Sequence, residues 1–179
     1  MLLLPEKLTT QRLVLQRLRY EDAEEIFYAY ASKAEATKFV SWARHKSVDD
    51  TRKFLSFAIH AWDEGKDFTY SIRLKHSNRL IGSIGVINLD YRVQFGYIFS
   101  PTHWNQGYAT ESCRKILDLL LPQKAVSGIT TFVDVDNRSS IRVLEKSGLT
   151  AEGVFPKWFH FPNQNNVAKD CILFSVPRT

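Results

Sequence analysis

The sequence predicts one mixed α/β domain whose sheet is largely antiparallel and contains a single parallel crossover. Short apolar segments of strand length recur along the chain and are rich in β-branched and aromatic residues. Between them lie segments whose apolar residues recur with the period of a helix. Taken in order, these elements read β-α-α-β-β-β-α-β-α-β-β, which favours hairpins joined by one strand–helix–strand unit.

The amino-terminal part is predicted to start with a strand at 12–18, followed by a helix that begins with the acidic turn Tyr20-Glu21-Asp22. Residues 33–46 show no periodicity and are predicted to be irregular. Ser47 and Asp50 have the spacing of a capping box, which indicates the start of a second helix.

Strands at 68–74 and 80–89 are predicted to form a hairpin through a turn at 76–78. Gly82 and Gly85 in the second strand indicate bulges or close packing against a neighbour.

The next strand, 95–99, contains Gly96, which again indicates a bulge or a close backbone approach. A turn-rich loop then leads into an amphipathic helix at 108–121, which Pro122 ends.

The carboxyl-terminal part is predicted to contain a strand at 129–135 that runs beside 95–99, and a short helix at 139–146. Strands at 151–159 and 170–176 form the last hairpin.

The composition is that of an ordinary soluble domain, with 44% apolar and 24% charged residues, and we expect residues 1–179 to form a single domain. No segment has the length of a membrane span, so no membrane association is expected. Cys113 and Cys171 are isolated and show neither metal-site nor disulfide spacing, which favours a reducing cytoplasm. The net charge of +5 suits an anionic ligand, and the absence of any nucleic-acid-binding motif argues against nucleic acid.

The start of the 108–121 helix is the best candidate for anion binding. Its leading N–H groups have no intrahelical partner and carry partial positive charge. Residues 106–110 hold no bulky β-branched residue before Thr110, and Gly107 allows a ligand to approach the main chain. These features predict a cradle for a diphosphate. An ordinary strand–loop–helix with a glycine in its turn is the alternative that this stretch alone leaves open.

Four blocks resemble one enzyme family. Gly96-Tyr97 together with W-N-Q-G-Y-A-T-E at 104–111 resembles the acetyl-CoA-binding motif of GNAT N-acetyltransferases, especially their RimJ/RimL branch. The block N-R-S-S-I-R-V-L-E-K-S-G-L at 137–149 is similar to that branch's N-x-x-S…E-K-x-G-F signature. The opening T-T-Q-R-L-V-L-Q-R-L and the closing A-E-G-V-F…D-C-I-L-F-S also fit, so the resemblance covers nearly the whole chain.

The resemblance implies the GNAT fold, in which the cofactor strand and the next strand splay apart around the pantetheine arm. It also implies direct acetyl transfer from acetyl-CoA, as co-substrate, to a primary amine without a metal, by a monomer or homodimer. The backbone around Ile98-Phe99 would hold the pantetheine and contact the oxyanion. Asn137 would orient the pantetheine, and the Ser140 hydroxyl would lie near the thioester sulfur, which makes these two the catalytic candidates. The full set of implied cofactor-binding residues is Ile98, Phe99, Trp104, Asn105, Gln106, Gly107, Tyr108, Ala109, Thr110, Asn137 and Ser140.

Three positions depart from the family pattern. Leu144 stands where many members have a tyrosine acid, Gln94 replaces a common glutamate, and Asn105 replaces a glycine. Ser140 is therefore the better proton-donor candidate. Asn137 also fits an ordinary helix N-cap, and Ser140 a hydroxyl that bonds a backbone amide. A non-catalytic coenzyme A-binding or interaction module on the same scaffold is the alternative to an enzyme.

No remaining side chain stands out as a general base, since four candidates are expected to be surface or turn residues: Asp90, Asp134, His103 and His160. Deprotonating an α-amine at pH 7 costs about 1–1.4 kcal/mol, against about 4.6 kcal/mol for a lysine. The missing glutamate thus favours an α-amino acceptor on a protein N-terminus, a peptide or a small molecule. Residues 38–42 and 156–166 are the candidate acceptor-pocket elements.

Overall fold

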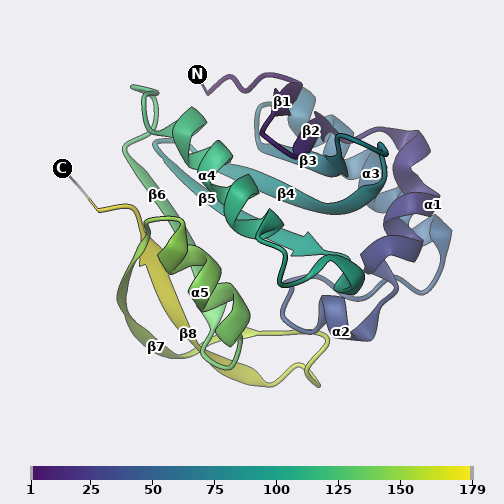
Figure 1. The fold of residues 1–179 in the computed structure, drawn as a ribbon. Coiled ribbons are helices and arrows are strands. Elements are labelled where there is room, and N and C mark those ends of the chain that lie inside the picture. Colours follow the sequence, from purple (N-terminus) through teal and green to yellow (C-terminus); the bar gives the residue numbers. More distant parts are fainter. Residues whose placement is uncertain (1, 178–179) are drawn as a thin grey trace.

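The structure is a computed structural model that describes residues 2–177. Met1, Arg178 and Thr179, which the predicted domain includes, lie outside the described residues. The described chain forms one eight-stranded sheet with the order β1-β2-β3-β4-β5-β6-β8-β7 (Figure 1). Every neighbouring pair is antiparallel except β5 and β6, so the predicted mixed sheet with one parallel crossover is confirmed.

The strands lie close to the predicted positions. They are β1 (Lys7–Thr9), β2 (Leu13–Arg17), β3 (Asp67–Leu74), β4 (Leu80–Leu89), β5 (Arg92–Phe99), β6 (Gly128–Asp134), β7 (Thr150–His160) and β8 (Ala168–Ser175). Strand β1 was not predicted, because a three-residue strand is too short to show a period.

The helical elements are η1 (Tyr20–Asp22), α1 (Ala23–Ile26), η2 (Phe27–Ala31), α2 (Ala34–Thr37), α3 (Val48–Asp63), η3 (Pro101–His103), α4 (Tyr108–Leu120) and α5 (Arg138–Lys146). The prediction that 33–46 is wholly irregular is wrong, since α2 forms a single helical turn there. One turn has no periodicity to detect; its Thr37 hydroxyl bonds Lys33 O at 2.8 Å. Among residues 2–177, no helix is long and apolar enough to cross a membrane.

Alternation along β5 assigns the helices to two faces of the sheet. Phe95 and Phe99 pack in the same buried cluster as Cys113 and Ile116 of α4, as the predicted apolar face of that helix requires. Ile98 points to the other face and packs with residues of α1, η2 and α3. In Figure 1, α4 and α5 lie on one side of the sheet, and α1 and α3 lie toward the other. Helix α4, whose start is the predicted anion cradle, therefore covers only one face of the sheet.

Two glycines shape the region around β5. Gly82 of β4 confirms the predicted close packing, because a Cβ there would collide with Ile98 O and the Phe99 ring. Gly96 does not behave as predicted. The β4–β5 register is continuous through it, and no atom lies within 4 Å of a Cβ built there. Gly96 therefore leaves open space beside β5 rather than forming a bulge or a close contact.

Candidate active site

The candidate active site begins where β5 and β6 separate. The two strands pair only through residues 92–94 of β5, and beyond them the β5 edge has no ladder partner among the described strands. Phe95 O faces β6, since it accepts a bond from Thr131 Oγ1 at 2.7 Å. Alternate residues of a strand direct their backbone polar groups to the same side. The N–H groups of Tyr97 and Phe99 therefore face the opening, which is the splay that the family resemblance implied.

The backbone of Ile98 faces the opposite way, toward Gly82 on β4. The Ile98 side chain is 7% exposed and lies in the buried cluster with α1, η2 and α3 on the other face of the sheet. Phe99 O accepts a bond from Trp104 Nε1 at 3.0 Å, so the indole ties the following loop to the end of β5. Ile98 and Phe99 were both predicted to hold the pantetheine through their backbone, but only the Phe99 N–H lies on the open edge. The other N–H on that edge belongs to Tyr97.

The loop before α4 ends in a left-handed residue that exposes the helix amides. Gly107 is the residue before the helix and has φ of 80°, and Asn105 has φ of 59°. Within residues 2–177, no oxygen accepts a hydrogen bond from the backbone N–H groups of residues 105–110. Because these donors lie at the positive end of the α4 dipole, their arrangement is suited to an anion, as the sequence predicts.

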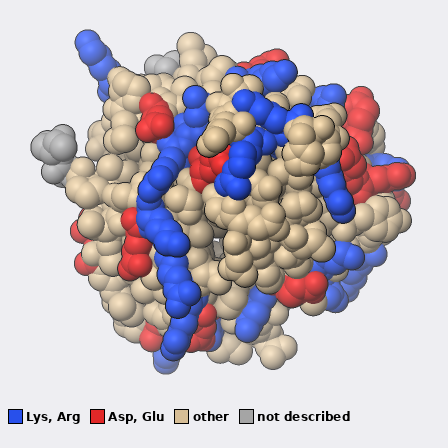
Figure 2. Space-filling view, viewed as in Figure 1, with Lys and Arg blue, Asp and Glu red and all other residues tan. Residues whose placement is uncertain are grey.

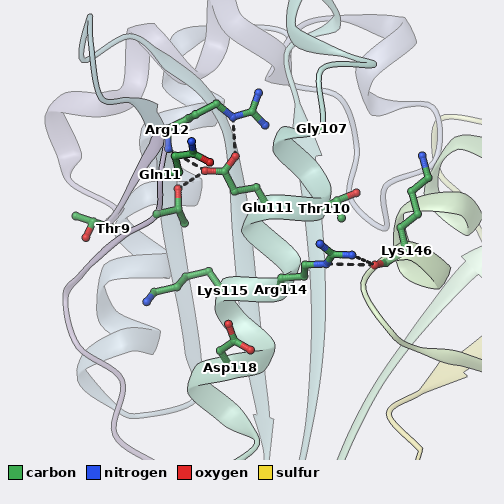
Figure 3. Close-up of a pocket in the computed structure, with 11 residues that line it drawn as sticks. Thr9, Gln11, Arg12, Gly107, Thr110, Glu111, Arg114, Lys115, Asp118 and Lys146 are labelled. Atoms are coloured by element: carbon green, nitrogen blue, oxygen red, sulfur yellow. Dashed lines mark hydrogen bonds and ion pairs between the residues drawn. The ribbon is translucent and has the colours of Figure 1, made fainter.

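Arg12, the residue just before β2, binds this loop (Figure 3). Arg12 Nη1 donates to Gln106 O at 2.9 Å, its Nε pairs with Glu111 at 2.7 Å, and its guanidinium lies 4.4 Å from the Tyr108 ring centre. Partial burial opposes ionisation of Glu111, but hydrogen bonds from Thr10 and Arg12 hold its pKa below the usual value. Arg12 thus neutralises the one carboxylate in the first turn of α4, which would otherwise repel a bound anion.

Positive charge extends from this site over the neighbouring helices. A groove of about 610 Å³ runs from Gly107 past Glu111, Arg114 and Lys115 to Lys146. Figure 2 shows a stripe of Lys and Arg side chains on the face that α4 and α5 cover. The exposed basic residues of those helices are Arg114, Arg138, Arg142 and Lys146. Such a field attracts a multiply charged anion.

The start of α5 lies across the opening from the α4 loop. Asn137 caps the helix, since its Oδ1 accepts a bond from Ser140 N at 3.2 Å, which confirms the predicted N-cap role. The Ser140 hydroxyl lies 2.6 Å from the Tyr97 hydroxyl. Burial raises the pKa of Tyr97 well above its usual value, so the phenol remains protonated. Leu144 is 1% exposed in the core and offers no polar group to the opening.

The β7–β8 loop is bound to a distant segment of the chain. Asn163 in that loop accepts a bond from Arg44 N and donates to Thr37 O and Trp42 O, at 2.7–2.9 Å. The loop is therefore clamped to the segment between α2 and α3. These are the two segments predicted to contribute to an acceptor pocket.

The four side chains considered as bases are not gathered in one place. Asp90 lies in the β4–β5 turn, at the end of β5 away from the opening. His103 Nδ1 lies 2.9 Å from Thr102 Oγ1, and His160 Nδ1 lies 2.8 Å from Asn166 O.

The prediction that Asp134 is a surface or turn residue is wrong. It is the last residue of β6 and only 1% exposed. Its carboxylate accepts bonds from Gln164 Nε2 and Asp136 N, both at 2.9 Å. The tertiary contact with the distant β7–β8 loop buries it, which the local sequence does not reveal.

The comparisons with known proteins agree with this geometry. Residues 12–150 match the family described as an acetyltransferase (GNAT) domain. The chain belongs to the GNAT acetyltransferase family. This GNAT protein is therefore an acetyl-CoA-dependent N-acetyltransferase. It is 28% identical over 172 residues to YoaA, an uncharacterized N-acetyltransferase of Bacillus subtilis (strain 168). The aligned residues cover 94% of this chain and 95% of YoaA.

Solved structures confirm the GNAT fold. RimL, a ribosomal L7/L12 alpha-N-protein acetyltransferase in complex with coenzyme A, superposes with a TM-score of 0.85 at 16% identity, covering 95% of this chain and 97% of RimL. The microcin C7 self-immunity acetyltransferase MccE, in complex with acetyl-CoA and AMP, gives 0.83 at 18% identity, covering 93% and 92%. At these identities the likeness concerns the fold alone.

Sequence reasoning missed three residues of this GNAT enzyme's site. The sequence patterns include Tyr97 only in the Gly96-Tyr97 pair, Arg12 only in a strand and Asn163 only in a loop, and they assign none of the three a role. Each acts on a partner more than 40 positions away in the chain. Nothing in the local pattern signals such contacts.

Proposed function

We propose that this enzyme transfers the acetyl group of acetyl-CoA to an α-amino group, on a protein N-terminus, a peptide or a small molecule. The observation that carries the proposal is the open β5 edge. It lies between two helix N-termini, and the last paired residue before it is Gln94, which stands where many family members have a glutamate. The proposal covers the acceptor class and the roles of individual residues.

In this proposal the diphosphate of acetyl-CoA binds the N–H groups of residues 106–110. Each amide bond to a charged oxygen contributes about 1.5–3 kcal/mol, so several together hold the diphosphate. Trp104 and Asn105 shape the loop, while Tyr108, Ala109 and Thr110 form the first helical turn. The pantetheine arm extends along the open β5 edge, which offers the Tyr97 and Phe99 N–H groups. This path brings the thioester to the start of α5, beside Asn137 and Ser140.

The reaction needs a neutral amine, a stabilised oxyanion and a leaving sulfur. The amine nitrogen attacks the thioester carbonyl, and an N–H on the open β5 edge donates a hydrogen bond to the oxyanion. Collapse of the tetrahedral species breaks the C–S bond. Ser140 then stabilises the sulfur by donating a hydrogen bond, which favours expulsion of the thiolate. The pKa of a thiol lies above neutral pH, so the departing thiolate takes its final proton from solvent or from the ammonium group of the acceptor.

The energetics favour an acceptor of low basicity. Gln94 cannot remove a proton, and the Asp134 carboxylate is already engaged by two N–H donors. An α-amine needs only about 1–1.4 kcal/mol to lose its proton at pH 7, whereas a lysine needs about 4.6 kcal/mol. RimL, whose fold this chain shares, is an alpha-N-protein acetyltransferase, which supports the same acceptor class.

The acceptor assay measures thiol release from acetyl-CoA with Ser- and Ala-initiated peptides, free amino acids, aminoglycosides and polyamines. Each peptide is paired with a control of the same sequence whose α-amine is blocked and whose lysine is retained. We expect turnover with free α-amines and none with the blocked peptides. Activity confined to lysine side chains or polyamines would contradict the proposal, as would coenzyme A binding without transfer to any amine.

A further inference from the structure

The Tyr97 hydroxyl of β5 meets the Ser140 hydroxyl of α5 at 2.6 Å, in the opening where β5 and β6 part. Tyr97 also approaches Ser140 O, at 3.5 Å. A separation of 2.6 Å is short for two neutral hydroxyls, which shows a well-formed bond. We propose that Tyr97 is the positioning residue for Ser140: it donates its proton to Ser140 Oγ and so leaves the serine proton free for the coenzyme A sulfur. This inference rests on the proposed location of the thioester.

Proton counting supports the direction of the bond. Each hydroxyl has one proton to donate. If Ser140 donates to Tyr97, no serine proton remains for the sulfur. If Tyr97 donates to Ser140 Oγ, the serine proton is free to rotate toward a ligand in the opening. A developing thiolate selects the second arrangement, because a hydrogen bond to a charged acceptor is stronger than one between neutral hydroxyls.

The surroundings keep the tyrosine in its donor form. Burial of the phenol raises its pKa, so it stays protonated in the pH range of an assay. Cys113 on α4 lies nearby, and its own burial also raises the thiol pKa, so it adds no charge there. The Asp, Glu, His, Lys and Arg residues within six positions of Ser140 are Asp134, Asp136, Arg138, Arg142, Glu145 and Lys146, and those within six positions of Tyr97 are Arg92 and His103. They are common to the wild type and to the variants below.

The first test uses binding and needs no acceptor. Calorimetry compares coenzyme A with desulfo-coenzyme A, which lacks the thiol, at pH 7 and at an alkaline pH above the pKa of the coenzyme A thiol, where the thiolate is present. In the wild type we expect coenzyme A to gain about fivefold or more in affinity over the desulfo analogue as the pH rises. Ser140→Ala should lose that gain, and Tyr97→Phe should lose part of it because the serine then lacks the donor that orients its hydroxyl. Both variants should bind the desulfo analogue as the wild type does.

The matched control is a second tyrosine–serine pair. The Tyr30 hydroxyl bonds Ser83 Oγ at 2.9 Å in the other core, away from the start of α5. Tyr30→Phe makes the same chemical change and should keep the full affinity gain. A gain of wild-type size in Tyr97→Phe, or no gain in the wild type, would overturn the proposal. Failure of the acceptor assay would leave this binding result unaffected, so the two proposals fail separately.

The second test is a double-mutant cycle on turnover with any acceptor that the panel identifies. We expect Ser140→Ala to lower kcat about 100-fold and Tyr97→Phe about tenfold, with KM for acetyl-CoA nearly unchanged. In the Ser140→Ala background, Tyr97→Phe should have no further effect, because the tyrosine acts through the serine. Additive losses in the double variant would show that Tyr97 acts independently and would overturn the assignment.

Discussion

At the residue scale, the α4 cradle consists of backbone N–H groups, so a single side-chain charge can change how well it holds an anion. Gln106 lies in this loop, and its side-chain Nε2 donates to Thr102 O at 3.2 Å. The residue is exposed and keeps its backbone N–H free. A glutamate of the same shape would place a negative charge beside the proposed diphosphate site.

We therefore expect Gln106→Glu to weaken coenzyme A binding by about 0.5–2 kcal/mol, or about 2- to 30-fold, because a charge near a helix N-terminus acts with that strength. Calorimetry at low and high salt measures the effect, which should shrink as salt screens the charge. Gln123→Glu is the control, since Gln123 lies just beyond the other end of α4. Equal affinity of the Gln106 variant and the wild type would place the diphosphate elsewhere.

At the scale of elements, the proposed acceptor site includes the contact between the β7–β8 loop and the segment from the end of α2 onward. Asn163 satisfies three backbone groups of that segment, which comes more than 100 positions earlier in the chain. Gln164, the next residue, holds the buried Asp134 carboxylate. One loop therefore positions both the acceptor-side segment and the end of β6.

Asn163→Ala should lower the free energy of unfolding by about 1–3 kcal/mol, because it leaves backbone groups without partners. It should also raise KM for the acceptor while leaving the coenzyme A affinity unchanged, since the cradle lies on a different loop. Asn88→Ala is the control. Asn88 Nδ2 donates to Gly65 O at 2.9 Å, so its loss affects stability only. An unchanged acceptor KM in Asn163→Ala would separate this loop from the acceptor site.

At the scale of the whole molecule, one buried arginine ties the first helical segment to the sheet. Arg73 of β3 is 3% exposed and donates to Asp22, which is 1% exposed, at 2.9 Å. It also pairs with Glu25 at 2.8 Å and bonds Asn78 O at 2.9 Å. Removing one partner of a buried ion pair leaves the other uncompensated, which is costly.

We expect Arg73→Met to lower the free energy of unfolding by about 3 kcal/mol at pH 7. Arg52→Met is the control: its pair with Asp49 is exposed, and the loss should be under about 1 kcal/mol. Urea titrations of both variants measure the difference. Similar small losses in the two would mean that Arg19, which also pairs with Asp22, suffices.

The ion pairs of Arg73 also determine whether the stability of the protein rises or falls with pH. The hydrogen bond from Arg73 lowers the pKa of Glu25 from its ordinary value of 4.5. The unfolded chain then binds more protons than the folded one below that value, so this contribution is present above about pH 4.5 and is lost as the pH falls. The stability of the wild type should fall more steeply below pH 4.5 than that of Arg73→Met. Parallel curves would exclude this linkage.

The sequence determined much of the fold because local chemistry suffices for it. The Ser47–Asp50 capping box and the apolar face of α4 follow from short-range rules that hold in any context. The strand–helix–strand unit fixed the parallel pair, and residue types at 104–111 and 137–149 identified the family. These features need no partner beyond a few neighbouring residues.

Tertiary structure alone decided which groups meet in the site. Tyr97 and Ser140 are 43 positions apart, and they meet because β5 and α5 flank the same opening. Asp134 is buried by Gln164, and the side of β5 on which each N–H lies follows from strand pairing. Sequence patterns report the burial and spacing of one element at a time, whereas the distance between two elements depends on how the complete sheet and its helices pack.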